Sequence, residues 1–316
     1  MQGTSKLTGG AILAMTSLKA ADDRKLGSPL KRGDFIDAHV HLWTDDFLKY
    51  PLAPGVKAGD MKPPTFLPSD ILHQAAPSGV TRVVLVQMSY YGTDNSYMLD
   101  VIRQSPKVFR GIAVVDPESN QPDGQMRKLA RKGVRGFRIY PPDEPSTAWL
   151  TGEGFTKMFL CGAQHQLALC LLVNPGDLRG VDRQCEKFPD TPVVIDHMAR
   201  IGRNGVISES DTNALCALAR HPQVKVKISA FYALGNHTPP HLDLVPLIKR
   251  LYDTFGPKRL MWASDCPFQV DDETYEDSIS LVRDRLDFLS DNDKQWMLRG
   301  TAEESFFQHA SLRAAP

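Results

Sequence analysis

The chain alternates short apolar segments with segments of helical spacing, from residue 35 to residue 299. Apolar, β-branched runs are expected as strands, and they lie at 35–43, 80–88, 109–115, 133–140, 167–173, 191–196, 224–229 and 259–264. Spans with apolar residues every third or fourth position are expected as helices, and they lie at 68–75, 95–105, 125–132, 155–165, 178–188, 210–221, 242–255, 275–289 and 293–299. Runs such as Val83–Val86 are apolar throughout, as strands covered on both faces require. This alternation predicts an α/β fold of the (β/α)8 TIM-barrel type.

The main alternative is an open, doubly wound parallel sheet. Such a sheet commonly binds a phosphate on a glycine-rich turn after an early strand. Gly133 and Gly136 belong to no Gly-x-Gly-x-x-Gly pattern, and no such turn follows an early strand here. The barrel is therefore the favoured architecture, and the first helix is expected to begin with Ser69 as its cap.

The first 33 residues differ from the rest of the chain. A short apolar stretch, Ala11–Met15, is followed by small residues at Ala20 and Ala21. This pattern is typical either of a disordered leader or of the end of an export signal. We expect a leader at 1–33, a single barrel domain at 34–307 and a tail at 308–316. The location is then cytoplasmic, or periplasmic or exported if the leader is a truncated signal.

Composition excludes several classes of partner. The chain has 37 basic and 37 acidic residues, so its formal net charge is zero, and no long run of either sign occurs. Nothing argues for a nucleic acid or an anionic membrane surface, and no apolar run reaches the length of a membrane span. The 5 cysteines are scattered and odd in number, which favours packed thiols over a disulfide framework. A small-molecule substrate is the expected partner, with a homo-oligomer possible.

Two histidines close the first predicted strand. Side chains two apart in a strand share a face, so His39 and His41 point the same way, with Ala38 and Val40 opposite. Such a pair can bind a metal or polarise an oxygen. The alternative is that a neighbour satisfies each ring separately.

Barrel enzymes carry their sites at the carboxyl ends of the strands. The second strand leads into a polar segment containing Ser89, which can offer a hydroxyl to a substrate, whereas residues 93–95 can equally build a turn and helix cap. On the fourth strand Arg138 and Tyr140 share a face. A guanidinium inside a barrel needs an anion, and we favour a substrate carboxylate over one of the barrel's own aspartates.

The sixth and eighth strands end in further ionisable residues. His197 and Arg200 follow the sixth strand, and Asp265 follows the eighth. Asp265 is suited to act as general base or to complete a metal site. Asp196 is expected to pair with an arginine at the rim, and Cys266 to be packed rather than nucleophilic.

These segments resemble the amidohydrolase superfamily, in its amidohydrolase-2 branch, over about residues 34–307. The resemblance rests on Ile36–Trp43, Ile195–Met198 and Trp262–Pro267. Within the branch the chain is similar to 2-pyrone-4,6-dicarboxylate lactonases and sugar lactonases, with local matches at 91–95, 135–138 and 196–200. The resemblance implies a hydrolase acting on a small lactone that is carboxylated or sugar-derived. It implies that Asp265 draws a proton from water, that His39, His41 and His197 polarise the carbonyl, and that Arg138 and Arg200 hold a carboxylate.

Two departures from the family pattern narrow this prediction. Metal-using members carry a histidine after strand five or a lysine at strand four, where this chain has Leu172–Asn174 and Arg138–Tyr140. We therefore expect no metal or a single divalent one, with zinc as the choice and His39, His41 and Asp265 as ligands. Pro141–Pro145 stands where the dicarboxylate lactonases place another arginine, so the pyrone dicarboxylate is a doubtful substrate.

Two other functions stay open at this point. One is a zinc-dependent decarboxylase of the same branch, and the other is a barrel that binds a ligand without catalysis. The segments 50–68 and 231–240 are expected to shape specificity, because they are long and lie near the predicted mouth.

Overall fold

The computed structural model describes residues 33–141, 149–271 and 273–308. Residues 1–32 of the expected leader and 309–316 of the expected tail lie outside this part of the chain, as do Pro142–Pro145 after the fourth strand. The expected division into leader, domain and tail is therefore not tested by the structure.

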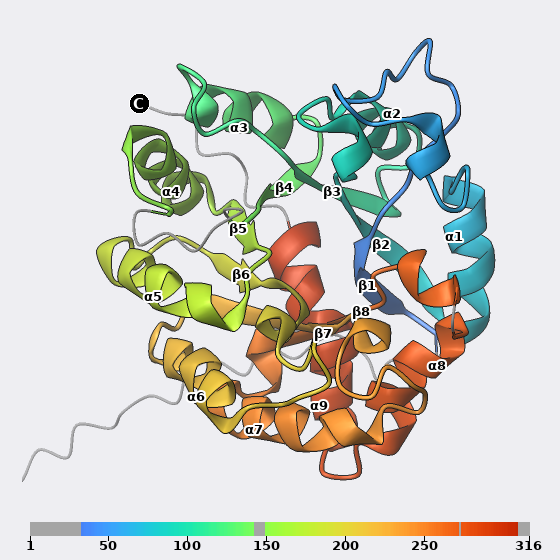
Figure 1. Ribbon diagram of the computed structural model, residues 1–316, viewed down its shortest axis with the longest axis vertical. Coiled ribbons are helices and arrows are strands. Elements are labelled where there is room, and N and C mark those ends of the chain that lie inside the picture. The colour runs from blue at the N-terminus through green and yellow to red at the C-terminus, as the bar shows by residue number, and fades with distance from the viewer. Residues whose placement is uncertain (1–32, 142–148, 272, 309–316) are drawn as a thin grey trace, which may run out of the picture.

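Eight parallel strands form a barrel in which each strand pairs with the next along the chain (Figure 1). The strands are β1 (Phe35–Val40), β2 (Val80–Val86), β3 (Phe109–Ala113), β4 (Val134–Ile139), β5 (Ala168–Leu171), β6 (Val193–Ile195), β7 (Val224–Ser229) and β8 (Leu260–Ala263). Every expected strand is present, and the prediction of a TIM barrel is confirmed.

Helices surround the strands in a ring (Figure 1). They are α1 (Pro68–Ala75), α2 (Ser96–Gln104), α3 (Pro122–Ala130), α4 (Glu153–His165), α5 (Leu178–Lys187), α6 (Glu209–Ala217), α7 (Val245–Phe255), α8 (Tyr275–Ser280) and α9 (Asp291–Gln295). The expected helix at 275–289 is shorter, because after Ser280 the chain passes into a π-helical turn, Leu281–Arg285. The expected cap at Ser69 is wrong. The cap is Leu67, two residues earlier, and the helix begins at Pro68, which has no N–H to satisfy. The Asp70 carboxylate accepts the N–H of Leu67 at 2.7 Å.

Two apolar clusters form the core. The larger one fills the space between strands and helices, while a smaller one lies inside the barrel and contains no residue of α1–α9. Its strand members are Ile36, Ala38, Val84, Val86, Ile112, Ala168, Cys170, Val194, Met261 and Ala263. Ala302, together with Phe306 and Phe307 of the C-terminal turn Glu303–Phe307, completes this inner cluster. Arg82 and Arg110, near the starts of β2 and β3, lie over the Phe307 ring, so the C-terminal turn covers the amino-terminal end of the barrel.

The barrel closes between β1 and β8. Val40 bridges Cys266, the His41 N–H donates to the Cys266 carbonyl at 2.9 Å, and the Asp265 N–H donates to the His39 carbonyl at 3.0 Å. Beneath this seam, the buried Asp37 carboxylate accepts from the Ser264 N–H at 3.0 Å and from the Tyr275 hydroxyl at 2.7 Å. The closure of the barrel thus places Asp265 beside the two histidines of β1.

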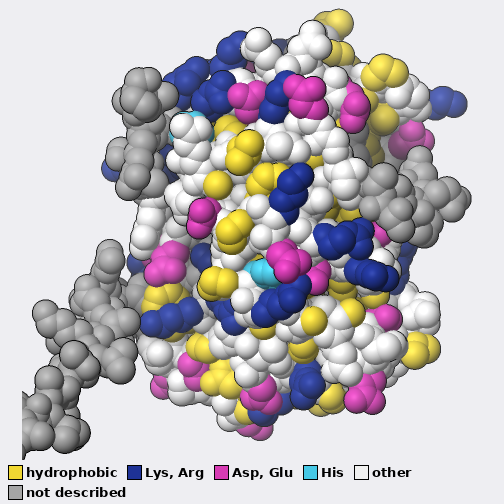
Figure 2. Space-filling view, turned by 90° about the vertical axis from the view of Figure 1, so that its left-hand side faces the viewer, with side chains coloured by type: hydrophobic (Ala, Val, Ile, Leu, Met, Phe, Trp, Pro, Cys, Tyr) yellow, Lys and Arg dark blue, Asp and Glu magenta, His cyan; other side chains and the backbone are white. Residues whose placement is uncertain are grey.

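The surface carries charges of both signs. On the face drawn in Figure 2, Lys and Arg side chains are interspersed with Asp and Glu, and hydrophobic side chains are scattered among them. Within the described residues, every helix is too short or too polar to cross a lipid bilayer.

Candidate active site

The two histidines of β1 converge as predicted, although the strand that carries them is irregular. Their Nε2 atoms are 3.1 Å apart. A register shift between Asp37 and Val40 interrupts the alternation, so Ala38 lies in the inner cluster rather than opposite the histidines, as we had expected. The His41 Nδ1 atom lies 3.0 Å from the Val86 carbonyl oxygen. Because a carbonyl only accepts, Nδ1 carries a proton, and the Nε2 atom of His41 faces the site.

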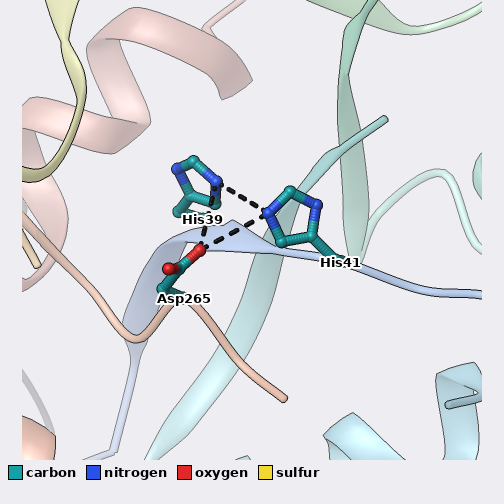
Figure 3. A group of neighbouring side chains, drawn as sticks. All are labelled: His39, His41 and Asp265. Carbon is teal, nitrogen blue, oxygen red and sulfur yellow. Dashed lines mark hydrogen bonds and ion pairs between the residues drawn. The ribbon is translucent and has the colours of Figure 1, made fainter. Parts of the chain in front are cut away.

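Asp265 lies directly against this pair (Figure 3). Its Oδ1 atom is 3.4 Å from Nε2 of His39 and 3.4 Å from Nε2 of His41, while Oδ2 accepts the Tyr232 hydroxyl at 2.8 Å. Burial raises the pKa of the Asp265 carboxyl, but the positive charge that His197, His39 and His41 carry when protonated and the hydrogen bond from His41 lower it by more, so the net pKa lies below its usual value. Asp265 is therefore an ionised carboxylate in a buried site.

His197 enters the site from a left-handed turn. The residues after β6, from His197 to Arg200, all have positive φ values, and His197 itself has φ 53°. This turn brings His197 Nε2 to 3.8 Å from Asp265 Oδ1, and its Nδ1 lies 2.9 Å from the Ser229 hydroxyl. Burial lowers the pKa of His197 to about 4, so the ring is neutral at neutral pH.

A buried ionic network lies beneath His39. Asp196 Oδ1 is 3.0 Å from Lys227 Nζ, and Asp196 Oδ2 is 3.4 Å from Arg138 Nη1. Both cations also reach His39: Lys227 Nζ lies 3.1 Å from Nδ1 and Arg138 Nη1 lies 3.0 Å from Nε2. Asp196 and Lys227 are fully buried, so the expected place of Asp196 at the rim is wrong, whereas its pairing with an arginine is observed. Burial and the Lys227 charge hold the pKa of His39 well below its usual value, so this ring is also neutral.

These residues form the floor of a cavity of about 470 Å³ at the carboxyl ends of the strands. Its lining includes most of the predicted site residues, namely His41, Ser89, Arg138, Tyr140, His197, Arg200 and Asp265. His39 lies just below the lining, in contact with His41 and Asp265. The structure therefore brings all eight predicted residues together, while their roles stay predictions.

The cavity also contains residues that the sequence reasoning missed. Tyr232 and Arg203 line it, and Lys227 supports its floor. Lys227 could have been found, because Lys225 and Lys227 alternate with valines in a strand that is otherwise apolar. Tyr232 and Arg203 lie after strand ends, in segments whose conformation carries no periodic signal.

Several expectations about neighbouring segments are corrected or refined. Residues 231–240 contribute Tyr232, Ala233 and Leu234 to the cavity, but no described residue of 50–68 lines it, so the expected role of that segment in specificity is not supported.

The Asn95 side chain has a structural role, because it accepts from the Val114 backbone N–H and donates to the Val114 carbonyl, at 2.9 Å each. All 5 cysteines are free and buried, as predicted, and burial raises the pKa of Cys266.

The anion that pairs with Arg138 is a carboxylate of the barrel itself. The sequence favours a substrate carboxylate as its partner, whereas in the structure Arg138 pairs with the Asp196 carboxylate. Arg138 Nε is nevertheless buried without a partner, and Arg138 lines the cavity together with Arg200 and Arg203. Among the described lining residues, Asp265 is the single carboxylate against these three guanidiniums. The cavity therefore favours an anionic ligand.

The donor atoms at the centre fit a single divalent metal. Four ligands at about 2.0–2.1 Å from a zinc ion lie about 3.3–3.4 Å from one another in a tetrahedron. The observed separations among His39 Nε2, His41 Nε2 and Asp265 Oδ1 are 3.1, 3.4 and 3.4 Å. In the described part of the chain these three form the only group of metal-ligand type, which agrees with the expectation of at most one metal. Arg138 Nη1 already contacts His39 Nε2, so a metal would have to displace that guanidinium.

Comparisons with known proteins agree with this geometry. The amidohydrolase family profile Amidohydro_2 matches residues 36–308. L-fucono-1,5-lactonase of Burkholderia ambifaria is 30% identical over 240 residues, which cover 73% of this chain and 80% of that protein. A 2-pyrone-4,6-dicarboxylate hydrolase of Comamonas testosteroni is 27% identical over 252 residues, covering 73% and 76%. The crystal structure of a Burkholderia multivorans amidohydrolase with bound zinc superposes with a TM-score of 0.73 at 21% identity, covering 87% of this chain and 99% of that one.

Proposed function

This chain belongs to the amidohydrolase family, and we propose that it hydrolyses the ester bond of a small, anionic lactone. The single observation that carries the proposal is the ionised Asp265 carboxylate, which faces the rings of His39, His41 and His197 at one end of an open cavity. The names of the relatives, a sugar lactonase and a pyrone dicarboxylate hydrolase, support an ester of the lactone type.

Asp265 acts as the general base in this proposal. A water molecule beside Oδ1 loses a proton to the carboxylate while its oxygen attacks the lactone carbonyl. Tyr232 donates to Oδ2, which leaves Oδ1 as the oxygen that faces the histidines. When the ring C–O bond breaks, the same proton passes from Asp265 to the departing alkoxide. The product is the open-chain hydroxy acid, so the reaction consumes only water.

His197 stabilises the oxyanion. If the Ser229 hydroxyl donates to Nδ1, then Nε2 carries the proton and can donate to the carbonyl oxygen as negative charge develops there. Because the pKa of His197 is about 4, it acts as a neutral donor rather than as an acid at neutral pH. Arg200 and Arg203 lie at the cavity wall, where they can hold a carboxylate of the substrate.

A divalent metal fits the same centre. His39, His41 and Asp265 would hold it, and when bound it would supply Lewis-acid polarisation of the substrate carbonyl. A zinc-dependent decarboxylase would use the same ligands, so the test below also measures release of carbon dioxide.

The proposal is tested with a panel of neutral sugar lactones and carboxylated lactones, with and without a chelator. We expect turnover of at least one carboxylated lactone, measured as acid release. Asp265→Asn should lower kcat/KM by about 10²–10⁴-fold, because the amide cannot accept the proton. Arg200→Gln should raise KM for carboxylated lactones more than for neutral ones.

The matched control is Asp190→Asn, which changes an exposed carboxylate before the amino-terminal end of β6, at the opposite end of the strand from the active site, and should leave kcat/KM unchanged. Wild-type turnover by the folded Asp265→Asn variant would refute the assignment of the base. Binding of lactones without any turnover would instead favour a ligand-binding barrel, and carbon dioxide release without acid formation would favour a decarboxylase.

We further propose that residues 34–307 form one catalytic domain, flanked by a leader at 1–33 and a tail at 308–316. The family match over residues 36–308 supports these bounds. The location proposed is the cytoplasm, or the periplasm or exterior if the leader is the remainder of a signal, and the enzyme can work as a homo-oligomer.

A further inference from the structure

A second cationic pocket lies at the end of the barrel opposite the active site. It has a volume of about 520 Å³ and lies between the C-terminal half of α2 and the turn that connects α3 to β4. Arg110 is the second residue of β3 and Arg135 the second residue of β4, so the pocket lies at the amino-terminal ends of these strands. The active-site residues follow the carboxyl ends of their strands, so the two cavities are separate.

Positive charge dominates this pocket. Five cationic side chains line it, and the only described carboxylate among the lining residues is Asp100. The cations are Arg103, Arg110, Arg131, Lys132 and Arg135.

The Asp100 carboxylate already has other partners and does not neutralise the remaining four cations of the pocket. Asp100 lies 3.0 Å from Lys49 Nζ, 3.1 Å from Arg103 Nη2 and 2.8 Å from the Tyr50 hydroxyl. The hydrogen bonds from Lys49, Tyr50 and Arg103 lower its pKa to about 2. This leaves Arg110, Arg131, Lys132 and Arg135 without an ion-pair partner among the described residues.

Two of these cations are held in place by neutral groups. Arg110 is only 8% exposed, its Nη1 donates to the carbonyls of Pro106 and Phe109, and its buried Nε has no partner. Arg135 Nη1 donates to the carbonyls of Ala130 and Val134 at 2.8 and 2.7 Å. Carbonyl oxygens orient a guanidinium but do not neutralise it, so the full positive charge is retained in a partly dehydrated place.

Repulsion among these groups makes the arrangement costly in the absence of an anion. Burial lowers the pKa of Arg110, and the charges of Arg135 and Arg82 lower it further. Several other guanidiniums of the described chain have carboxylate partners, for example Arg82 with Glu303 at 3.0 Å and Arg220 with Asp182 at 2.7 Å. An anion bound in this pocket would neutralise its cations in the same way.

We propose that this pocket binds a small multivalent oxyanion of the phosphate type, such as a phosphate ester or a polyphosphate group. Guanidiniums present pairs of N–H groups that match the oxygens of phosphate, and several cations suit a multiply charged group. No aromatic side chain lines the pocket within the described chain, so it offers no surface on which a nucleotide base could stack. The inference is independent of the proposed lactonase activity.

The experiment measures pyrophosphate binding to the purified protein by isothermal titration calorimetry at constant ionic strength. Citrate serves as a multivalent anion of different geometry, and inorganic phosphate as the smaller probe. We expect pyrophosphate to bind more tightly than citrate and to raise the thermal midpoint. The exposed double variant Arg131→Gln/Lys132→Gln should weaken pyrophosphate binding by at least about tenfold, because two charge-assisted contacts are lost.

Two controls separate this pocket from other sites. Lys128→Gln removes an exposed cation of α3 that does not line the pocket, and pyrophosphate binding should be unchanged. Arg200→Gln removes a cation of the active-site cavity and should also leave binding unchanged.

Four outcomes would overturn the proposal. They are the absence of pyrophosphate binding, equal binding by the double variant and wild type, loss of binding in Arg200→Gln or Lys128→Gln, and citrate binding as tight as pyrophosphate. Lactone turnover is measured on the same samples, so failure of this proposal is distinguishable from failure of the proposed enzyme activity.

Discussion

At the scale of single residues, His197 makes stability depend on pH. Its pKa is about 4 in the folded protein, mainly because burial disfavours the charged ring, whereas an unfolded histidine has a pKa of about 6.5. Between these values the unfolded chain binds a proton that the folded protein does not. The free energy of unfolding should therefore fall as the pH drops from about 6.5 to about 4, by up to about 3 kcal/mol from this residue.

Urea denaturation between pH 4 and pH 7 measures this effect. The free energy of unfolding of His197→Asn should change less steeply with pH than that of the wild type, because the variant lacks the side chain that takes up this proton on unfolding. The control His73→Gln changes an exposed histidine of α1 and should keep the wild-type slope. Equal slopes for His197→Asn and wild type would contradict the burial argument.

The active-site residues that could be predicted from the sequence are those whose place is set by their position at the end of a strand. His39, His41 and Asp265 follow from the alternation of strands and helices, since the carboxyl ends of barrel strands meet at one rim. Tyr232 was missed because it reaches Asp265 from a loop with no periodic pattern. Lys227 was missed because the strand was interpreted from its apolar residues alone, and the charge that it neutralises, Asp196, lies just after the neighbouring strand β6.

At the scale of elements, the buried pair of Asp196 and Lys227 joins the start of the turn after β6 to β7. Lys227→Met should lower the free energy of unfolding by about 3–5 kcal/mol, because Asp196 then keeps a buried charge with only Arg138 opposite it. The double variant Asp196→Asn/Lys227→Met should recover part of this loss. Urea denaturation of both variants measures the difference.

Lys225→Met is the matched control. Lys225 lies on the same strand, but its contact is a hydrogen bond to the Ser305 hydroxyl at 2.8 Å rather than a buried carboxylate. Its loss should cost about 1 kcal/mol. A double variant no more stable than Lys227→Met would show that the uncompensated Asp196 charge is not the cause.

The backbone conformation of the residues that follow the strands was harder to predict than the strands themselves. After β6 the residues from His197 to Arg200 adopt left-handed conformations, and Ala230 and Asp265 do so after β7 and β8, with φ 56° and 67°. No glycine marks any of these positions, so the sequence carries no signal for them. Such conformations cost free energy and persist because surrounding contacts hold them, as the Tyr232 hydroxyl does at Asp265.

At the scale of the whole molecule, the two ends of the barrel are built differently. The active-site end is open and polar, whereas the C-terminal turn Glu303–Phe307 closes the other end with aromatic side chains. Sequence periodicity predicted helices up to residue 299 but could not place the chain beyond it. The turn covers the barrel because contacts with distant strands hold it, such as Glu303 with Arg82 of β2 and Ser305 with Lys225 of β7.

This closure predicts that the last turn contributes strongly to the stability of the whole barrel. Phe306 is fully buried in the inner cluster, so Phe306→Ala should lower the free energy of unfolding by about 3–5 kcal/mol, and Phe306→Leu by less, since it leaves a smaller void. Leu160→Ala, at a 55% exposed position on α4, should change it by no more than about 0.5 kcal/mol. If Phe306→Ala behaved like Leu160→Ala in urea denaturation, the barrel would be stable without this closure, and its amino-terminal end would have to be sealed by the strand side chains alone.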